Sequence, residues 1–266
     1  MIEENKLGAR PLEFLWVSVG VISVPFVLIW ACVNPSDWPW LVAGILFGKF
    51  FVGMVGKNIA FHRYICHRSF KTTKWKHYFL LFANSFSTNS PLTAATVHRY
   101  HHKQSDTDRD PHSPKQYGFW NAVLMWRGRS VQWKKSMPLP VDLMRDKTLV
   151  WLHKNCITVY GLYALICFLI SWKLAVFVLF FATGLIAINN SIIFIGLVHM
   201  NIPGSYRNFD TNDLSYNNKI VEFFSPGEGY HNNHHMYPGR YNMAIKDHEF
   251  DLAGWIVEKV FIDETK

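Results

Sequence analysis

Four long apolar runs restrict what this chain can fold into. They cover residues 14–33, 38–56, 155–172 and 174–198, and Lys49 is the only charged residue in any of them. A helix needs roughly 20 apolar residues to cross ~30 Å of hydrocarbon. The alternative is a buried soluble core, but four runs of this length favour membrane-spanning helices.

Very short links join these runs in pairs, at residues 34–37 and 171–173, which predicts two helical hairpins. Between the hairpins, residues 57–150 carry 16 Lys and Arg against 5 Asp. Because loops rich in Lys and Arg stay in the cytosol, we expect this segment and both termini on the cytosolic side. The prediction is an all-α, multi-pass membrane protein of one domain, 1–266, with a cytosolic helical cap formed by residues 57–150 and 199–266.

One further uncharged stretch, residues 79–97, contains many Ser, Thr and Asn residues. We expect an interfacial or re-entrant helix there, since a fifth span would carry the later histidines across the membrane. The four cysteines form no CxxC pair and so indicate neither a disulfide framework nor a thiolate zinc site. The net charge of +8 comes largely from residues flanking the spans, a distribution that does not favour nucleic acid binding.

Nine of the 13 histidines fall into a pattern. One HxxxxH and two HxxHH motifs, with one single histidine, comprise His62, His67, His98, His101, His102, His199, His231, His234 and His235. In a helix, an HxxHH motif places its three rings on one stripe. In an α-helix the rings of HxxxxH are ~140° apart. That motif therefore needs a helix end, a local irregularity, or a pocket between its two rings.

The nine histidines lie just past the predicted cytosolic ends of the spans and suit a metal centre. Imidazoles in this number favour iron, copper, zinc or nickel, and nine exceed what one ion binds, so two metals are expected. Zinc would indicate hydrolysis and iron would indicate oxygen chemistry; spacing alone leaves both open. Glu228 and His231 form the only ExxH pair, which disfavours the carboxylate-bridged site of soluble di-iron bundles.

Three strings resemble the histidine boxes of the integral membrane fatty acid desaturases, particularly the Δ9 acyl-CoA and acyl-lipid branch: HRYICHRSF from His62, HRYHHKQSDTDRDPH from His98, and GEGYHNNHHMYP from Gly227. The resemblance extends over about residues 56–255. It implies a four-span, mushroom-shaped protein with two non-haem irons held by the nine histidines. It also implies insertion of a cis double bond into an acyl chain lying in an apolar tunnel, with O2 and two electrons from cytochrome b5 or a ferredoxin with its reductase. This branch commonly has an asparagine where the chain has Ile195.

Polar residues near the motifs are expected to orient the ligating rings by accepting their free N–H groups. The candidates are Asp106, Asp108, Asp110, Glu228, Asn232 and Asn233, with Asp213 and Asn217 in a stretch similar to the family's. The alternative for residues 106–110 is an acidic turn in solvent. His77, His112, His153 and His248 fit no motif, and we expect them at the surface or interface.

A basic cluster, comprising Arg127, Arg129, Lys134 and Lys135, is a candidate contact for a substrate head group or an acidic electron donor. Binding to anionic lipid head groups is the slightly favoured alternative. Lys49 either lines the acyl tunnel or extends its amine to the interface, and its position favours the latter.

The resulting prediction is an O2-dependent desaturase of a fatty acyl chain linked to CoA, carrier protein or lipid. A hydroxylase on the same scaffold is the near alternative. A histidine-rich metal transporter is the distant one, because a transporter places its ligands near the bilayer midplane.

Overall fold

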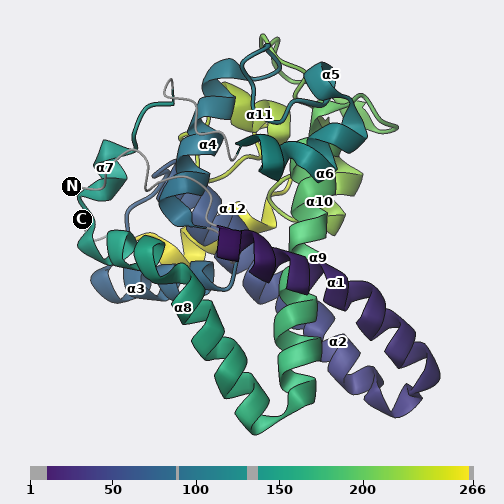
Figure 1. The fold of residues 1–266 in the computed structure, drawn as a ribbon. Coiled ribbons are helices and arrows are strands. Elements are labelled where there is room, and N and C mark those ends of the chain that lie inside the picture. The colour runs from purple at the N-terminus through teal and green to yellow at the C-terminus, as the bar shows by residue number, and fades with distance from the viewer. Residues whose placement is uncertain (1–10, 88–89, 131–136, 264–266) are drawn as a thin grey trace.

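Helices make up nearly all of the regular structure in this computed structural model, which describes residues 11–87, 90–130 and 137–263 (Figure 1). Within these ranges, the only sheet is the antiparallel pair β1 (Ser205–Tyr206) and β2 (Asn217–Asn218). Four helical stretches are long and apolar enough to cross a membrane: Leu15–Val33, Pro35–Cys66, Lys147–Ile170 and Leu174–His199. The prediction of a helical membrane protein with four candidate spans is confirmed.

Two of the four stretches, the second and the fourth, change their winding along their length. The first and third are single α-helices, α1 (Pro11–Val33) and α8 (Lys147–Ile170). The second comprises the 3-10 turn η2 (Pro35–Asp37), α2 (Trp38–Leu46) and the π-helix η3 (Phe47–Cys66). The fourth comprises the π-helix η4 (Leu174–Phe180), α9 (Phe181–Asn189), the π-helix η5 (Asn190–Gly196) and the 3-10 turn η6 (Leu197–His199).

The second and third helices are longer than the apolar runs that predicted them. The second continues ten residues beyond Gly56, and this extension is supported by packing against α3 (Lys74–Ser85) and α4 (Pro91–Gln104). His62 therefore lies on the helix and not in a segment after it. The third begins at Lys147, where Asp146 caps the helix by accepting hydrogen bonds from two backbone N–H groups of its first turn.

The single helix predicted over residues 79–97 is wrong. The structure has two helices there, α3 (Lys74–Ser85) and α4 (Pro91–Gln104). A proline is well suited to the first position of a helix, where its missing N–H is not needed, and Pro91 starts α4 in this way. Because the chain breaks between the two helices, α4, which carries the HxxHH histidines, can take a different direction from α3.

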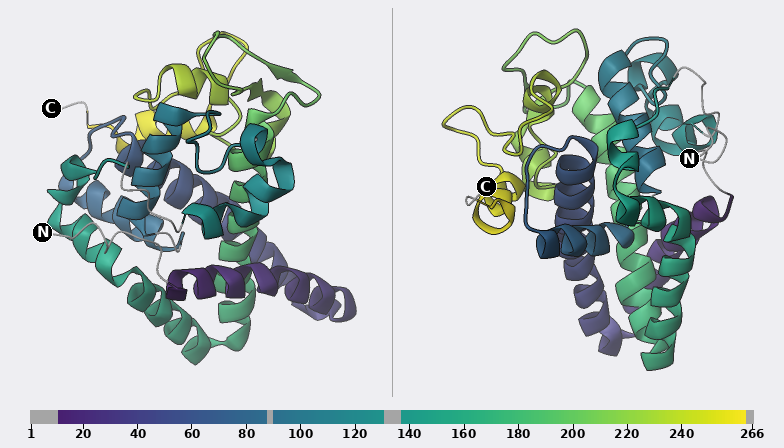
Figure 2. Two further views of the ribbon diagram at one scale, coloured as in Figure 1. Left: turned by 45° about the horizontal axis from the view of Figure 1, so that its top comes forward. Right: turned by 90° about the vertical axis from the view of Figure 1, so that its left-hand side faces the viewer.

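The remaining short elements gather with α3 and α4 at one end of the long helices (Figure 2). They are α5 (Pro114–Tyr117), α6 (Phe119–Ser130), α7 (Val141–Met144), α10 (Lys219–Phe224), α11 (His231–Met236), α12 (Leu252–Ile256) and the π-helical turn η7 (Val257–Phe261).

The two short links between the long helices lie together at the other end. Asp37 in the first link accepts hydrogen bonds from the Lys173 ammonium of the second link and, at 2.8 Å, from the indole N–H of Trp30. This contact ties the α1–α2 pair to the α8–η4 pair.

Small residues let α1 and α9 pack at backbone contact. A Cβ added at Gly184 would lie 1.9 Å from the carbonyl oxygen of Gly20, a distance that no rotamer change relieves. Close approach of this kind is how membrane helices gain packing energy without a hydrophobic driving force.

The substitution Gly184→Ala is therefore expected to force the two helices apart and to destabilise the protein by about 1–3 kcal/mol, the usual cost of overpacking. Thermal unfolding of the purified protein in detergent measures this loss. Gly161→Ala is the matched control, since the nearest atom to its new Cβ is a Trp16 ring carbon at 3.9 Å. Equal melting temperatures for the two variants would contradict the packing argument.

Candidate metal centre

The nine motif histidines, which come from segments far apart in the sequence, converge into two groups. His62, His67, His98, His102 and His234 form a five-histidine cluster, and His101, His199, His231 and His235 form a four-histidine cluster. Within each cluster, the nitrogens that could bind a metal all lie within 4.8 Å of one another. The clusters are neighbours, because the ring centroids of His102 and His235 are 4.4 Å apart.

Each HxxHH helix contributes to both clusters. On α4, His98 and His102 belong to the five-histidine cluster and His101 belongs to the other. Residues at i and i+4 lie one above the other on a helix, while i+3 lies slightly to one side. The motif therefore places its three rings on one stripe, as predicted, and the stripe straddles the boundary between the clusters. The helix α11 divides its three rings in the same manner.

The π-helical winding of η3 explains how HxxxxH serves one cluster. The N–H of His67, which caps this helix, donates to the carbonyl of His62 at 3.1 Å, a bond from residue i+5 to residue i. The two ring centroids are 5.0 Å apart, although ordinary α-helical winding would turn them ~140° away from each other. Of the three alternatives that the spacing left open, the structure has both the helix end and the irregularity.

The Nε2 atoms of the five-histidine cluster point at one another. They are 2.9 Å apart between His62 and His234, 2.8 Å between His67 and His98, 3.0 Å between His98 and His102, and 2.9 Å between His102 and His234. Two nitrogens each about 2.1 Å from one ion and at right angles to each other are about 3.0 Å apart. These separations therefore fit adjacent ligand positions around one transition-metal ion.

The four-histidine cluster has the same spacing. Its Nε2 separations are 3.1 Å between His199 and His231 and 3.0 Å between His231 and His235. Both clusters thus present convergent imidazole nitrogens, the donor type that transition metals prefer.

Burial keeps most of these rings in the neutral form that binds metals. It lowers the pKa of His67 to about 3 and that of His235 to about 4, in the second case against the opposing hydrogen bond to Asp213. Burial, reinforced by the neighbouring rings, also lowers the pKa values of His98 and His102 well below the usual range. A neutral imidazole has a lone pair to donate, so no proton has to leave these rings before a metal binds.

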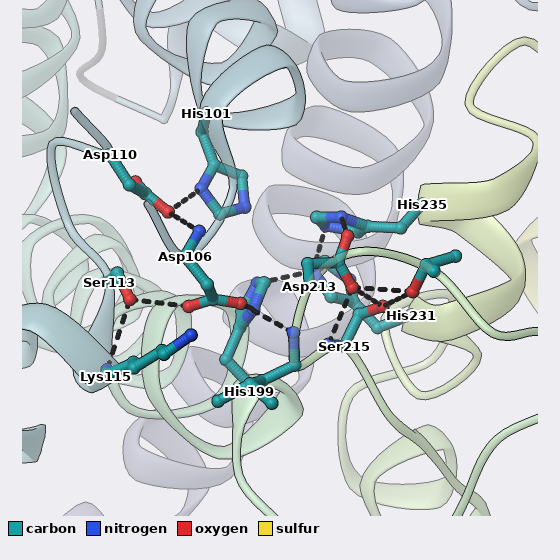
Figure 3. Close-up of polar contacts among 12 residues, drawn as sticks. His101, Asp106, Asp110, Ser113, Lys115, His199, Asp213, Ser215, His231 and His235 are labelled. Carbon is teal, nitrogen blue, oxygen red and sulfur yellow. Dashed lines mark hydrogen bonds and ion pairs between the residues drawn. The ribbon is translucent and has the colours of Figure 1, made fainter. Parts of the chain in front are cut away.

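Three carboxylates orient the four-histidine cluster by accepting hydrogen bonds from ring Nδ1–H groups (Figure 3). Asp110 accepts from His101 at 2.9 Å, Asp106 from His199 at 3.1 Å, and Asp213 from His235 at 2.7 Å. Burial alone would raise the pKa of Asp106, but its hydrogen bonds, led by that from His199, outweigh burial and bring it to about 2. A carboxylate on Nδ1 leaves Nε2 as the metal-binding atom and makes the imidazole a stronger donor.

The two other acidic residues predicted to orient ligating rings, Glu228 and Asp108, differ in burial. Glu228 is buried, and its Oε1 lies 3.6 Å from Nδ1 of His62. Asp108 is exposed at the surface, so the solvated alternative holds for this residue of the 106–110 turn.

The expectation that Asn232 and Asn233 hold ligating rings is wrong. The Asn232 side-chain oxygen accepts from the backbone N–H groups of Asn208 and Phe209, and that of Asn233 accepts from the side-chain amides of Asn208 and Asn217. On a helix, the residues between His231 and His234 point away from the stripe that carries the rings. They brace α11 against the 208–217 segment instead.

Removing one carboxylate tests whether these hydrogen bonds matter for metal binding. In Asp213→Asn the partner of His235 loses its negative charge, and we expect metal affinity to fall about 10–100-fold, as is usual for residues that orient a ligand. Metal retained during dialysis against a graded series of chelator concentrations measures the change. Asp108→Asn, an equal change at an exposed carboxylate, is the control, and indistinguishable retention curves for the two variants would rule the orienting role out.

Sequence reasoning missed two residues at this centre. Phe194 lies against rings of both clusters, with centroid distances of 5.2 Å to His62, 5.2 Å to His98 and 5.4 Å to His231. His112 was expected at the surface but is buried against His101, with ring centroids 4.4 Å apart. Its position two residues after Asp110 was the available signal.

The other predicted positions divide as follows. His153 is buried on α8 and hydrogen-bonded to Ser90, His77 is partly buried, and only His248 is exposed as expected. The predicted basic cluster of Arg127, Arg129, Lys134 and Lys135 lies outside the residues whose side chains the structure describes.

Comparison with known proteins agrees with this centre. Residues 36–242 match the fatty acid desaturase family. The chain is 30% identical over 256 residues to the sn-1 stearoyl-lipid 9-desaturase of Anabaena variabilis, covering 93% of this chain and 88% of that protein. It is 29% identical over 240 residues to Delta-9 acyl-lipid desaturase 1 of Arabidopsis thaliana, with 87% and 76% covered. It is 28% identical over 266 residues to a hex-5-enoyl-[acyl-carrier protein] acetylenase of Moorena producens, with 91% and 80% covered. The chain is a membrane oxidoreductase that belongs to the fatty acid desaturase family.

Proposed function

We propose that this protein introduces a double bond into a fatty acyl chain, using O2 and two iron ions held by the five- and four-histidine clusters. The observation that carries the proposal is the division of nine histidines, six of them buried and three half-buried, into two adjacent sets with convergent Nε2 atoms. Bound iron would activate O2 for removal of hydrogen from an unactivated methylene, chemistry that no side chain can perform.

The residues of the chain position and shield this chemistry. The nine rings would hold the two ions, and Phe194 presents a hydrocarbon surface to both clusters, against which an acyl chain can lie while water is kept out. The charge around the clusters is unequal, since the four-histidine cluster has three carboxylates on its rings and the five-histidine cluster has Glu228 nearby. The two ions would therefore experience different electrostatic environments.

The proposed arrangement in the membrane is two hairpins with the histidine cap and both termini in the cytosol. The excess of Lys and Arg in residues 57–150 supports this orientation. The electrons would come from an external donor, cytochrome b5 or a ferredoxin with its reductase. A preference for the Δ9 position is supported by the names of the acyl-lipid 9-desaturases to which the chain is similar.

The test is conversion of a labelled acyl substrate by the purified protein in nanodiscs, with iron, a reductase and each candidate electron donor. Mass spectrometry of the product should show loss of two hydrogens, and fragmentation should place the double bond. Gain of one oxygen would instead identify a hydroxylase. Metal flux across proteoliposomes without oxygen uptake would identify a transporter and refute the proposal.

A further inference from the structure

Tyr64 belongs to the turn of helix that carries two of the candidate metal ligands. It lies on η3, two residues after His62 and three before His67. Two residues along a helix turn a side chain to about the opposite face, so Tyr64 points away from the five-histidine cluster. A helix with its side chains is about 10–12 Å across, which puts the phenol ring roughly that far from the cluster. Tyr64 is therefore close to the metal centre without being a ligand.

The hydroxyl of Tyr64 contacts an imidazole on a different helix. It lies 2.9 Å from Nδ1 of His77 on α3, and the two ring centroids are 5.8 Å apart. Nε2 of His77 lies 3.3 Å from the carboxylate of Asp146 at the start of α8. Because an ionised carboxylate only accepts, it favours the ring proton on Nε2 and leaves Nδ1 to accept from the phenol. The phenol, the imidazole and the carboxylate thus form one polar row.

This row is held in place at both ends. Asp146 uses its other oxygen to accept from two backbone N–H groups in the first turn of α8, which fixes the carboxylate. The Tyr64 ring is half-buried among apolar side chains, with the Phe70 ring at a centroid distance of 5.2 Å. The side chains of His77 and Asp146 are 19% and 34% exposed, so the row runs from the helix of the metal centre toward the protein surface.

Such a row is suited to a phenol that gives up an electron. Oxidation of a phenol that keeps its proton would leave a cationic radical, and a charge in a half-buried apolar site is costly. A base within hydrogen-bond reach can take the proton as the electron leaves. The imidazolium that forms at His77 would then be stabilised by the negative charge of Asp146.

We propose that Tyr64 is a redox-active residue that donates an electron to the metal centre when O2 has reacted there and no acyl chain is present to be oxidised. One electron passes from the phenol to the oxidised centre, and the phenolic proton moves to Nδ1 of His77. The products are a neutral tyrosyl radical, an imidazolium paired with Asp146, and a centre reduced by one electron. The external electron donor then reduces the radical, and the proton returns to the phenol oxygen. The inference rests on the proposed function and adds to it a step that spares the ligating rings from oxidation.

Freeze-quench electron paramagnetic resonance tests the proposal. The iron-loaded protein in nanodiscs is reduced, mixed with O2 in the absence of an acyl substrate, and frozen at successive times. We expect a tyrosyl signal in the unmodified protein and none in Tyr64→Phe. Tyr163→Phe is the matched control and should keep the signal. Tyr163 is also half-buried beside α3, but its hydroxyl bonds to that of Ser85, which is no base for the phenolic proton.

His77→Gln separates a proton acceptor from a structural contact. A glutamine can still accept a hydrogen bond from the phenol but does not take up its proton, so we expect the radical to form about 100-fold more slowly, within the usual contribution of a positioned base. Asp146→Asn keeps the helix cap, for which asparagine and aspartate are about equally suited, and removes the charge that stabilises the imidazolium. The radical should therefore decay faster in Asp146→Asn than in the unmodified protein. Should Tyr64→Phe fail to fold, a spin trap on the unmodified protein, located by peptide mass spectrometry, identifies the oxidised residue.

A signal that persists in Tyr64→Phe, a spin-trap adduct on another tyrosine alone, or equal rates in His77→Gln and the unmodified protein would each overturn the inference. A photo-oxidant, flashed under argon on the same iron-loaded protein with its centre left oxidised, separates this result from the proposed function. A Tyr64 signal after the flash, with neither a double bond nor a signal from O2, would refute the desaturase proposal and leave Tyr64 and His77 as an oxidisable pair. A double bond formed with substrate, but no radical without it, would refute the inference alone.

Discussion

Replacement of His231 by alanine is expected to remove one bound iron ion and to abolish desaturation. His231 belongs to the four-histidine cluster, so the variant keeps only three imidazoles for that ion, fewer than the four to six positions that such an ion fills. The loss of metal affinity in this variant should exceed the ~10–100-fold loss expected when a residue that only orients a ligand is replaced. Iron per chain, measured by elemental analysis, should fall from about two to about one, and product should drop below detection.

The comparison variants make this result specific. His234→Ala leaves four imidazoles in the five-histidine cluster, the number that the other cluster has at the outset, so this variant should retain more iron than His231→Ala while activity still falls. His248→Ala changes an exposed histidine outside both clusters and should retain iron and activity in full. Unchanged iron and product in His231→Ala would mean that the clusters do not hold the reacting metals.

A buried ion pair gives the second large effect. The guanidinium of Arg63 is 1% exposed and bonds to the Asp251 carboxylate at 2.8 Å and to the Tyr241 carbonyl at 2.7 Å, which ties the second helix to the segment before α12. In Arg63→Met the carboxylate stays buried without its partner, and this normally costs about 3–5 kcal/mol. We expect a large drop in melting temperature, or no folded protein in detergent, since Arg63 lies one residue from His62 and helps to fix that turn of helix.

The pair between Arg68 and Asp142 is the matched control. Its atoms are 3.5 Å apart and its side chains are 58% and 40% exposed, so Arg68→Gln should cost no more than about 1 kcal/mol. Size-exclusion profiles and thermal unfolding of the two variants should therefore differ clearly. A melting temperature for Arg63→Met equal to that for Arg68→Gln would show that Arg63 does not anchor the C-terminal segment.

The candidate spans and the histidine motifs were predictable because both depend on local patterns. Length and absence of charge are enough to identify a membrane helix, and the i, i+3, i+4 spacing is enough to put the rings of α4 on one stripe. The continuation of the second helix to Cys66 was not predictable, because the apolar run stops at Gly56 while the helix is extended by packing against α3 and α4. The division into five and four histidines also depends on how distant helices meet.

The residues around the rings show the same limit. Asp106, Asp108 and Asp110 are the same residue type in one short segment, so the sequence does not distinguish them. In the structure Asp106 and Asp110 are buried and hydrogen-bonded to histidines, whereas Asp108 faces solvent, because the backbone turns set the direction of each side chain. Phe194 carries no sequence signal, since a phenylalanine in an apolar run is unremarkable until three imidazoles are found around it. Contacts of this kind belong to tertiary structure alone.

The backbone contact between Gly20 and Gly184 has a mechanical consequence. It pins the fourth long helix near its middle, while the bond from His199 to Asp106 pins the end of that helix at the cap. The stretch between these two points, residues 185–198, is therefore restrained at both ends, and residues within 185–194 line a cavity between the second and fourth long helices. A change in the width of this cavity therefore requires displacement of the second long helix or of α10, whose Phe224 also lines it.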